Sequence, residues 1–386
     1  MGAFNDMTQS PDDKRPDARI MAPETAAIPS VELSDPDRLC QNPLVSVLMI
    51  TYNHERYIGA AIEGVINQKT DFPFELIIGE DCSPDNTRAV ALDYQKRYPH
   101  IIRVIVSDRN VGMHLNSKRM EKRVRGEYIA VCEGDDRWSD QTKLQKQITF
   151  LEQHPDYGAI CTSCEIEKNG VVAGRTPGID EECDVELAHL LFANIIPTLT
   201  VCCRRSVSER YWLEMGKVFR DERMGDLPLW CWMSLHSKIR YIPACTAVYR
   251  HLEESASHSL SEEKQHQFAV SAMRIRAYFL ASVAPAVRRK LVSAWVVALM
   301  PNMLRFSDRE GVLLLRQVAA KQGTWINAYV MRMMQVLYPV GGLKVGIMMA
   351  RVHYFAQELC EARSLTPLYK KMARRFSVLR SVCARD

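Results

Sequence analysis

Residues 126–138, GEYIAVCEGDDRW, join an apolar run directly to three carboxylates. The run Tyr128 to Cys132 is typical of a buried strand, and Glu133, Asp135 and Asp136 follow it within four residues. Carboxylates this close repel one another unless a positive partner lies among them. The stretch therefore predicts a buried strand that ends at a charged site.

The same alternation of apolar strands and helical patterns precedes this stretch. Strands are predicted in PLVSVLMITYN (43–53), FELIIGED (74–81) and IIRVIVSD (101–108), and helices in ERYIGAAIEGVINQ (55–68), DNTRAVALDYQKRYP (85–99) and DQTKLQKQITFLEQHP (140–155). The second helix has Asp85 or Asn86 as its expected cap. Val45 to Ile50 is continuously apolar, as a strand covered on both faces requires. The pattern predicts an α/β fold with a doubly wound, mostly parallel sheet.

Three strand ends carry polar or acidic groups, namely Thr51 to Asn53, Glu80–Asp81 and Glu133 to Asp136. Ligands of such sheets bind beyond the carboxyl ends of the strands, so we expect these ends to be neighbours. A divalent ion, Mg²⁺ or Mn²⁺, would supply the missing positive charge and usually carries substrate phosphates. A nucleotide ligand is therefore predicted.

No glycine-rich phosphate loop is present in this part of the chain, so basic side chains would have to help hold the phosphates. Lys118 and Arg119 are the candidates. The alternative for both residues is a solvated helix face.

Five segments in order resemble the motifs of family 2 glycosyltransferases with the GT-A fold, a Rossmann-like architecture. They are VSVLMITYNHERYIGAAIEGVINQ (45–68), ELIIGEDCSPDNT (75–87), NVGMHLNSKR (110–119), RGEYIAVCEGDDRWSDQTKLQKQITFLEQHP (125–155) and MGDLPLWCWMS (224–234). The resemblance covers about residues 43–259 and is strongest to bacterial enzymes that build surface polysaccharides. It implies an inverting, metal-dependent transfer of a sugar from a nucleoside diphosphate sugar, UDP- or dTDP-linked, to a glycan or lipid-linked acceptor.

The resemblance also implies roles for individual residues. Asp136 would be the firmest metal ligand, and Asp135 would contact the ribose or sugar and share the metal site. Glu133 stands where the family commonly has Asp. The remaining predicted nucleotide-binding residues are Thr51 and Tyr52 in the nucleoside pocket, Glu80, Asp81 as the acceptor of a hydrogen bond from the base, and Arg119.

The resemblance places the catalytic base at Asp226, with Asp221 and Glu222 as rivals. From the residues alone, Asp226 reads as a helix cap before Leu227-Pro228. NIIPTLTVCCRRS (194–206) predicts a strand with Thr198 and Thr200 on one side, as sugar contacts or plain packing. His251 is either a further ligand of the metal or diphosphate, or simply solvated.

Composition and charge suggest three regions: a disordered leader (1–42), the GT-A domain (43–260), and a basic helical region (261–386). The helices are predicted either to lie on the inner face of the cytoplasmic membrane or to pack on the GT-A domain or a second subunit, giving a homo-oligomer. The net charge of +4 is too small to argue for nucleic acid.

The cysteines bear on the compartment and on metal binding. Twelve cysteines without framework spacing or a secretory signal predict reduced thiols in a cytoplasmic protein. A zinc site is conceivable at two cysteine pairs, Cys161 with Cys164 and Cys202 with Cys203. No second metal-binding pair follows them, which favours a structural role.

Two other functional classes compete with a glycosyltransferase. A nucleotidyltransferase would need a phosphate loop near the first strand, and TYNHERY (51–57) is not one. A non-catalytic GT-A scaffold is disfavoured by the intact Asp81, Asp135, Asp136 and Asp226.

Overall fold

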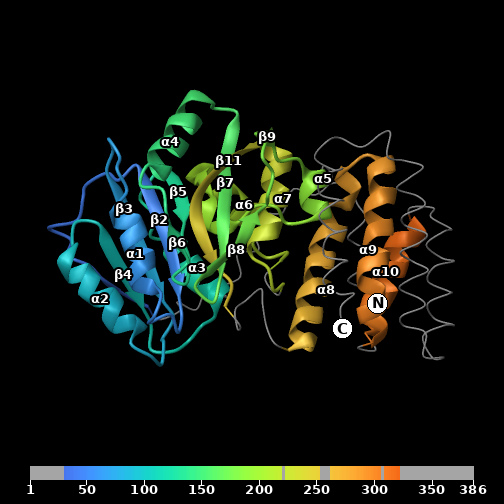
Figure 1. Cartoon of the computed structure of the whole chain (residues 1–386), viewed down its shortest axis with the longest axis horizontal. Coiled ribbons are helices and arrows are strands. Elements are labelled where there is room, and N and C mark those ends of the chain that lie inside the picture. Colours follow the sequence, from blue (N-terminus) through green and yellow to red (C-terminus); the bar gives the residue numbers. More distant parts are fainter. Residues whose placement is uncertain (1–29, 220–221, 253–260, 306–307, 322–386) are drawn as a thin grey trace, which may run out of the picture.

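The computed structural model describes residues 30–219, 222–252, 261–305 and 308–321. A twisted sheet runs through the molecule, helices cover both of its faces, and a further group of helices lies at one side (Figure 1).

The described residues form one mixed sheet of eleven strands in the order β1-β4-β3-β2-β5-β10-β7-β11-β6, with β8 paired to β7 and β9 to β11. The strands are β1 (Val31–Leu33), β2 (Val45–Thr51), β3 (Phe74–Glu80), β4 (Ile102–Val106), β5 (Tyr128–Val131), β6 (Arg137–Trp138), β7 (Tyr157–Lys168), β8 (Val171–Thr176), β9 (Cys183–Asp184), β10 (Cys202–Arg204) and β11 (Lys238–Arg250). β4, β3, β2 and β5 are mutually parallel. β10 is antiparallel to both of its neighbours. The predicted α/β class and the four predicted parallel strands are confirmed.

The helices divide between the two faces of the sheet. α1 (Ile58–Ile66), α2 (Thr87–Arg97) and α4 (Lys143–Gln153) share a core with Val45, Val47 and Met49 of β2. α3 (Met113–Glu121), α5 (Leu187–Phe192), α6 (Arg205–Met215) and α7 (Asp226–His236) share the other core with Leu48. This burial on both faces explains the continuous apolar run of β2. The three helices predicted from periodicity are α1, α2 and α4.

Two expectations about local structure need correction. Residues 31–33, inside the segment expected to be disordered, form β1, which pairs with β4; residues 1–29 lie outside the described residues. Residues 198–200, expected in a strand, form a 3₁₀ turn, η2 (Thr198–Thr200), and the strand begins only at Cys202. Pro197 starts this turn, and the side chain of Thr200 donates to its carbonyl, a local alternative to strand pairing.

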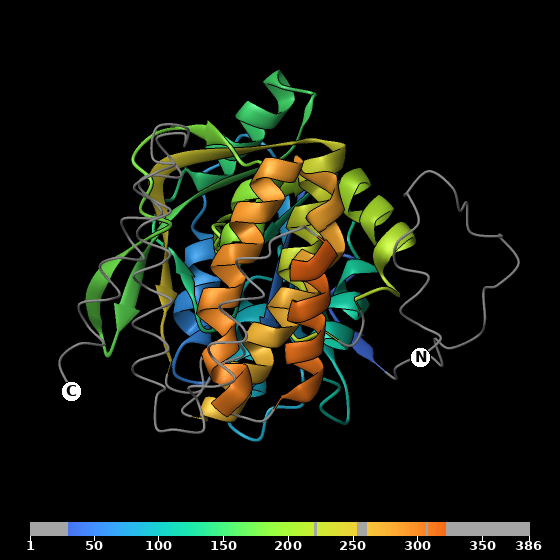
Figure 2. The same cartoon turned by 90° about the vertical axis from the view of Figure 1, so that its right-hand side faces the viewer.

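The C-terminal described segment is helical, as predicted. α8 (Glu262–Phe279) is followed by a 3₁₀ turn, η3 (Leu280–Ser282), then by α9 (Pro285–Arg305) and α10 (Arg309–Lys321). The three helices stand side by side (Figure 2), and their buried side chains belong to the same core as α5 and α7. The indole of Trp295 donates to the carbonyl of Leu191 at 3.1 Å. None of the helices in the described ranges has the length and apolarity needed to cross a bilayer. The predicted basic helical region continues to residue 386, and residues 322–386 lie outside the described ranges.

At the amino ends of the parallel strands, one fully buried carboxylate joins four segments. Glu75 of β3 accepts from Ser46 Oγ of β2 at 2.6 Å, from Arg103 Nη1 of β4 at 3.0 Å and from Arg125 Nε, just before β5, at 2.8 Å. A buried charge is tolerated only when it is paired and hydrogen-bonded in this way. Glu75 therefore fixes the relative positions of these strands.

Replacing Glu75 by Gln should lower the free energy of unfolding by about 3–5 kcal/mol, because the buried guanidinium of Arg103 and the partly exposed one of Arg125 lose a common counter-ion. Denaturant unfolding followed by circular dichroism would measure the change. Glu32→Gln is the matched control: Glu32 also pairs with Arg103 but is a quarter exposed, so a smaller loss is expected. Equal losses in the two variants would contradict a special role for Glu75.

Candidate functional site

The three polar strand ends lie side by side, as predicted, because β3, β2 and β5 are adjacent and parallel. Thr51 at the end of β2 is paired in register with Glu80 at the end of β3. The chain leaves both strands through residues with positive φ, Asn53 at 60° and Cys82 at 59°. Left-handed backbone at residues other than glycine is uncommon and concentrates at functional sites. The edge formed by these turns is therefore the candidate site.

The acidic loop after β5 passes directly over the end of β2. Gly134 donates its N–H to the carbonyl of Ile50 at 2.9 Å. A Cβ at this glycine would lie 2.6 Å from Oγ1 of Thr51 and 3.1 Å from Nδ1 of His54. Only glycine permits this approach, so Gly134 determines how close the carboxylates of the loop come to the β2 end.

Arg250, at the end of β11, clamps this loop from the other side. Its N–H donates to Oδ1 of Asp136 at 2.8 Å, and its Nη1 donates to the carbonyl of Asp135 at 2.9 Å. Nε donates to Glu167 at 3.2 Å, and the guanidinium lies 5.3 Å from the ring centre of Tyr57. The positions of both loop aspartates therefore depend on a residue more than a hundred positions away.

The acids of the loop remain poorly compensated despite this clamp. Burial and the neighbouring Asp135 raise the pKa of Glu133 to about 8, and the charge of Asp226 adds to the shift. Burial and the other two acids raise the pKa of Asp136 well above its usual range. Oε2 of Glu133 is buried and accepts no hydrogen bond from the described residues. Such a set of acids suits a divalent cation, which would keep the carboxylates ionised.

The number of available ligands limits the kind of metal site. No group of three or more His, Cys, Asp or Glu side chains in the described part of the chain is arranged to hold a metal ion by itself. Mg²⁺ is commonly held by one or two carboxylates together with substrate phosphates and water. Asp135 and Asp136 fit that type of site, in which a bound diphosphate completes the coordination.

At the end of β3, the predicted nucleotide-binding residues mainly hold the protein itself together. Asp81 is almost inaccessible, and its two oxygens accept the N–H groups of Val111 at 2.9 Å and Gly112 at 2.8 Å. Glu80 is fully buried and pairs with Arg88 and with the N–H of Ser83. Both carboxylates thus shape the loops around the site.

Arg119 is buried rather than solvated. Its Nη2 donates to the carbonyl of Glu80 at 2.7 Å and lies 3.5 Å from Oδ1 of Asp81. The side chain of Arg119 therefore stabilises the carboxyl end of β3. The solvated helix face considered for Arg119 is therefore wrong.

The end of β2 offers the accessible part of the site. Tyr52 is 44 % exposed, whereas Thr51 is buried and its Oγ1 lies 3.3 Å from Nδ1 of His54. Nε2 of His54 lies 3.8 Å from Oδ2 of Asp135. Burial lowers the pKa of this imidazole, so it is a weak counter-ion. Tyr52 is free to contact a planar ligand, and Thr51 acts through the packing of the loop.

Asp226, the predicted base, stands at the start of α7 and faces the acidic loop closely enough to affect the pKa of Glu133. Its Oδ2 accepts from Asn194 Nδ2 at 2.8 Å and from Thr198 Oγ1 at 3.2 Å, and its Oδ1 accepts the N–H of Leu227 at 2.8 Å. Gly225, not Asp226, occupies the capping position. Asp226 is thus a partly exposed carboxylate held in a fixed orientation.

The structure separates the other candidates on this side. Thr198 reaches Asp226, whereas Thr200 is fully buried and donates to Pro197, so a sugar contact by Thr200 is wrong. Asp221 lies outside the described residues, and no described contact joins Glu222 to the acidic loop. His251 donates its N–H to the carbonyl of Glu167, and a role in ligation stays a prediction.

Arg250, His54 and Asn194 belong to the site but were not predicted. Each is a single polar residue, and none belongs to a spacing pattern. Arg250 offered one signal, since a cation must lie near three clustered carboxylates. Nothing in the sequence indicated which of the many arginines it would be.

The cysteine pairs do not form a zinc site. Cys161 and Cys203 belong to the core on one face of the sheet, and Cys164 and Cys202 belong to the core on the other face. All four are buried and unbridged. Adjacent residues on a strand point to opposite faces, so these thiols cannot share one ion. The predicted structural role is confirmed.

Comparison with known proteins agrees with this geometry. Residues 46–204 match the model of the glycosyl transferase family 2. An uncharacterized protein of Mycobacterium tuberculosis is 34 % identical over 230 residues, which are 57 % of this chain and 62 % of that relative. The putative glycosyltransferase EpsE of Bacillus subtilis is 31 % identical over 49 % of this chain and 66 % of its own length. The chain thus spans a little under two thirds of the length of these relatives.

A third relative has a name that states its reaction, but it matches a shorter part of this chain. It is the UDP-Glc:alpha-D-GlcNAc-diphosphoundecaprenol beta-1,3-glucosyltransferase WfgD of Escherichia coli, 30 % identical over 34 % of this chain and 50 % of its own length. Among solved structures, TarS 1–349 of S. aureus in complex with UDP-GlcNAc superposes with a TM-score of 0.51 at 19 % identity, covering 80 % of this chain and 88 % of that one. This likeness supports the fold.

Replacing Arg250 by Met should weaken Mn²⁺ binding about 10–100-fold, the usual effect of losing a residue that orients metal ligands. Calorimetric titration of Mn²⁺ in the presence of UDP would measure it. Arg137→Met is the control, since Arg137 lies 3.7 Å from the same Glu167 but has no described hydrogen bond to the acidic loop. If both variants bind Mn²⁺ like the wild type, Arg250 does not position the loop.

Proposed function

This chain contains a family 2 glycosyltransferase domain with the GT-A fold, and from that premise we propose that it is an inverting, metal-dependent glycosyltransferase. It would move a sugar from a UDP- or dTDP-linked donor to a glycan or lipid-linked acceptor during synthesis of a surface polysaccharide. The named relatives support this assignment. WfgD, for example, is named as an enzyme with a nucleotide-sugar donor and a diphosphoundecaprenol-linked acceptor.

One observation carries the proposal: an oriented carboxylate, Asp226, faces a second group of carboxylates at the carboxyl ends of three parallel strands. An inverting transfer needs these two features on opposite sides of the sugar. One group must hold the leaving diphosphate, and the other must take the proton of the attacking hydroxyl.

On the donor side, we assign Asp135 and Asp136 to the cation, with Mn²⁺ or Mg²⁺ as the candidates. The cation would supply charge stabilisation to the departing diphosphate. Arg250 holds the two aspartates in place, and Gly134 sets their height above β2. Tyr52 would contact the nucleoside.

The other residues expected at the nucleotide would act indirectly, by shaping the loops around it. Thr51 packs beneath the acidic loop, and Glu80, Asp81 and Arg119 fix the end of β3 and the Val111–Gly112 loop. A hydrogen bond from the base to Asp81 remains part of the proposal, because a carboxylate that accepts two N–H groups retains acceptor capacity.

On the acceptor side, Asp226 would accept the proton as the hydroxyl oxygen attacks the anomeric carbon. Asn194 and Thr198 both donate to Oδ2, which fixes the direction of the carboxylate. Oδ1 accepts only one backbone N–H among the described contacts and keeps a lone pair for the hydroxyl proton. Attack from the side of Asp226, with the diphosphate leaving toward the acidic loop, would invert the anomeric carbon.

The location of the enzyme is part of the same proposal. A lipid-linked acceptor would bring it to the inner face of the cytoplasmic membrane. The basic residues near the C-terminus would suit a surface of anionic lipid.

Nucleotide binding should depend on the cation and on Asp136. We expect UDP to bind in the presence of Mn²⁺, and Asp136→Asn to weaken that binding at least tenfold, because a neutral amide is a poor ligand for a hard cation. Calorimetry with UDP, with and without Mn²⁺, makes the measurement. Absence of UDP binding under both conditions would favour a non-catalytic scaffold over an enzyme.

The base can be tested separately from donor binding. Asp226→Asn should keep donor affinity and lose about 10²–10⁴ in transfer rate, since loss of a general base has an effect of this size. Glu222→Gln serves as the control because it removes a nearby carboxylate of the same segment. Should Asp226→Asn retain its turnover while Glu222→Gln loses it, the base has been misassigned.

A further inference from the structure

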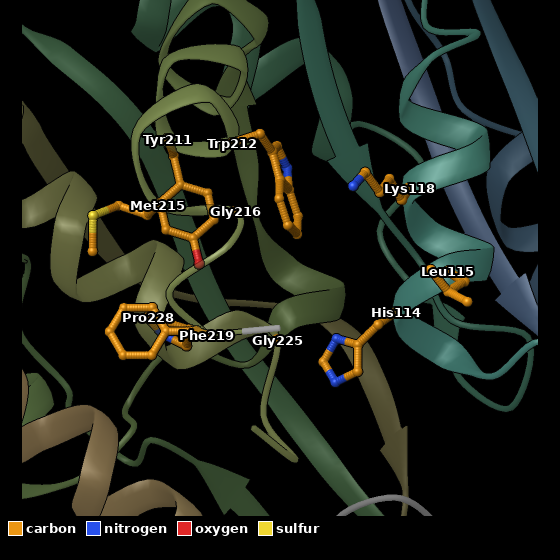
Figure 3. Close-up of a pocket in the computed structure, with 10 residues that line it drawn as sticks. All are labelled: His114, Leu115, Lys118, Tyr211, Trp212, Met215, Gly216, Phe219, Gly225 and Pro228. Atoms are coloured by element: carbon orange, nitrogen blue, oxygen red, sulfur yellow. The ribbon is translucent and has the colours of Figure 1, made fainter. Parts of the chain in front are cut away.

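A cleft opens beside the candidate base, between α3, α6 and the start of α7 (Figure 3). It encloses about 480 Å³ of space between atoms, including a part open to solvent. Gly225 and Pro228, on either side of Asp226 in the sequence, line it. A ligand in this cleft would therefore lie beside the segment that carries the candidate base, although the side chain of Asp226 does not itself line the cleft.

The two walls of the cleft differ in chemistry. α6 and the segment after it supply an apolar and largely aromatic wall, with Tyr211, Trp212, Met215 and Phe219. α3 supplies His114, Leu115 and Lys118. The side chains of Lys118 and Trp212 point into the same space from opposite sides (Figure 3). Aromatic rings pack well against the C–H face of a pyranose, and the ammonium group attracts an anion.

Lys118 is available for such an anion. Its ammonium group makes no hydrogen bond or ion pair with any residue that the structure describes. The acid that its charge affects is Glu121, one turn further along α3, and burial raises the pKa of that carboxyl to about 8. Glu121 is therefore mainly protonated near pH 7, and the positive charge in the cleft is not neutralised from within.

His114 and Gly225, which both line the cleft, approach each other closely. A Cβ added at Gly225 would lie 3.1 Å from Cε1 and 3.2 Å from Nδ1 of His114. The imidazole of α3 therefore already touches the backbone that precedes the candidate base.

We propose that this cleft is the acceptor subsite and that it selects an anionic sugar, with the pyranose face on Trp212 and a phosphate or carboxylate on Lys118. The proposal rests on the function proposed above, because it takes Asp226 as the base. A neutral or purely apolar acceptor would leave the ammonium group desolvated without a partner, which is unfavourable. The anion would come either from a sugar phosphate, as at the end of a lipid-linked chain, or from a uronic acid.

Binding of small probes to the full-length protein tests the proposal without knowledge of the natural acceptor. The probes are glucose 1-phosphate, methyl glucuronide, methyl glucoside and inorganic phosphate, and the signal is quenching of tryptophan fluorescence, confirmed by calorimetry. We expect one of the two anionic sugars to bind at least tenfold more tightly than methyl glucoside and than inorganic phosphate. Preference for glucose 1-phosphate identifies a sugar-phosphate acceptor, and preference for methyl glucuronide identifies a uronic acid.

Variants of the cleft residues test whether the probes bind in this cleft. Lys118→Met should remove the preference for the anionic sugar about tenfold, and Lys118→Arg should restore it. Trp212→Leu should weaken binding of every sugar probe. Lys122→Met is the matched control, because Lys122 is an exposed lysine at the end of the same helix and does not line the cleft. It should bind all probes like the wild type.

The outcomes separate the two proposals. If UDP binds with Mn²⁺ but no anionic sugar is preferred, or if Lys122→Met has the same effect as Lys118→Met, the acceptor proposal is overturned and the proposed function stands. Loss of UDP affinity in Lys118→Met would assign the lysine to the donor and would also overturn it. Binding of an anionic sugar through Lys118 in a protein that does not bind UDP would show a sugar-binding cleft, but it would overturn both the glycosyltransferase and the role of the cleft as its acceptor subsite.

Discussion

The carboxylate of Glu75 is the constraint on which the arrangement of the parallel strands depends. It is fully buried at the start of β3, and it is bonded to side chains from β2, from β4 and from the segment before β5. A charge in this environment is stable only if all of these partners are present together. By fixing the amino ends of four strands, it also determines which carboxyl ends meet at the opposite edge, where the candidate site lies.

Both edges of the sheet contain buried carboxylates, but the edges differ in how well these negative charges are paired with arginines. At the Glu75 edge each acid has arginine partners, and the result is stability. At the other edge, the described contacts of Arg250 reach Asp135 and Asp136 but not Glu133, and burial raises the pKa of Glu133 and Asp136. Negative charge is fully balanced by arginines at one edge and only partly balanced at the other, which is typical of a stable scaffold that carries a binding site. The missing charge is what a cation and its diphosphate would provide.

Much of the fold could be predicted because burial leaves a periodic trace in the sequence. The strands at Val45–Thr51 and Phe74–Glu80 are mostly apolar on both sides, since helices cover both of their faces. The segment after Pro197 had a similar composition but forms a 3₁₀ turn, because the N–H and the hydroxyl of Thr200 both donate to the carbonyl of Pro197. β1 was missed for a related reason: an edge strand of three residues is held by its partner, β4, and has no pattern of its own.

The sequence by itself determined the α/β class, the adjacency of three polar strand ends and the excess of acid at one of them, because these properties depend on residues close together in the chain. Only the tertiary structure decided which distant residues complete the site. It placed Arg250 on the acidic loop, Asn194 on Asp226, and Lys118 opposite Trp212 across the cleft. It also showed that Asp81 and Arg119, which local position assigned to the ligand, mainly support the protein. Contacts between distant segments depend on how whole elements pack, and packing leaves no local pattern at the single residues that it brings together.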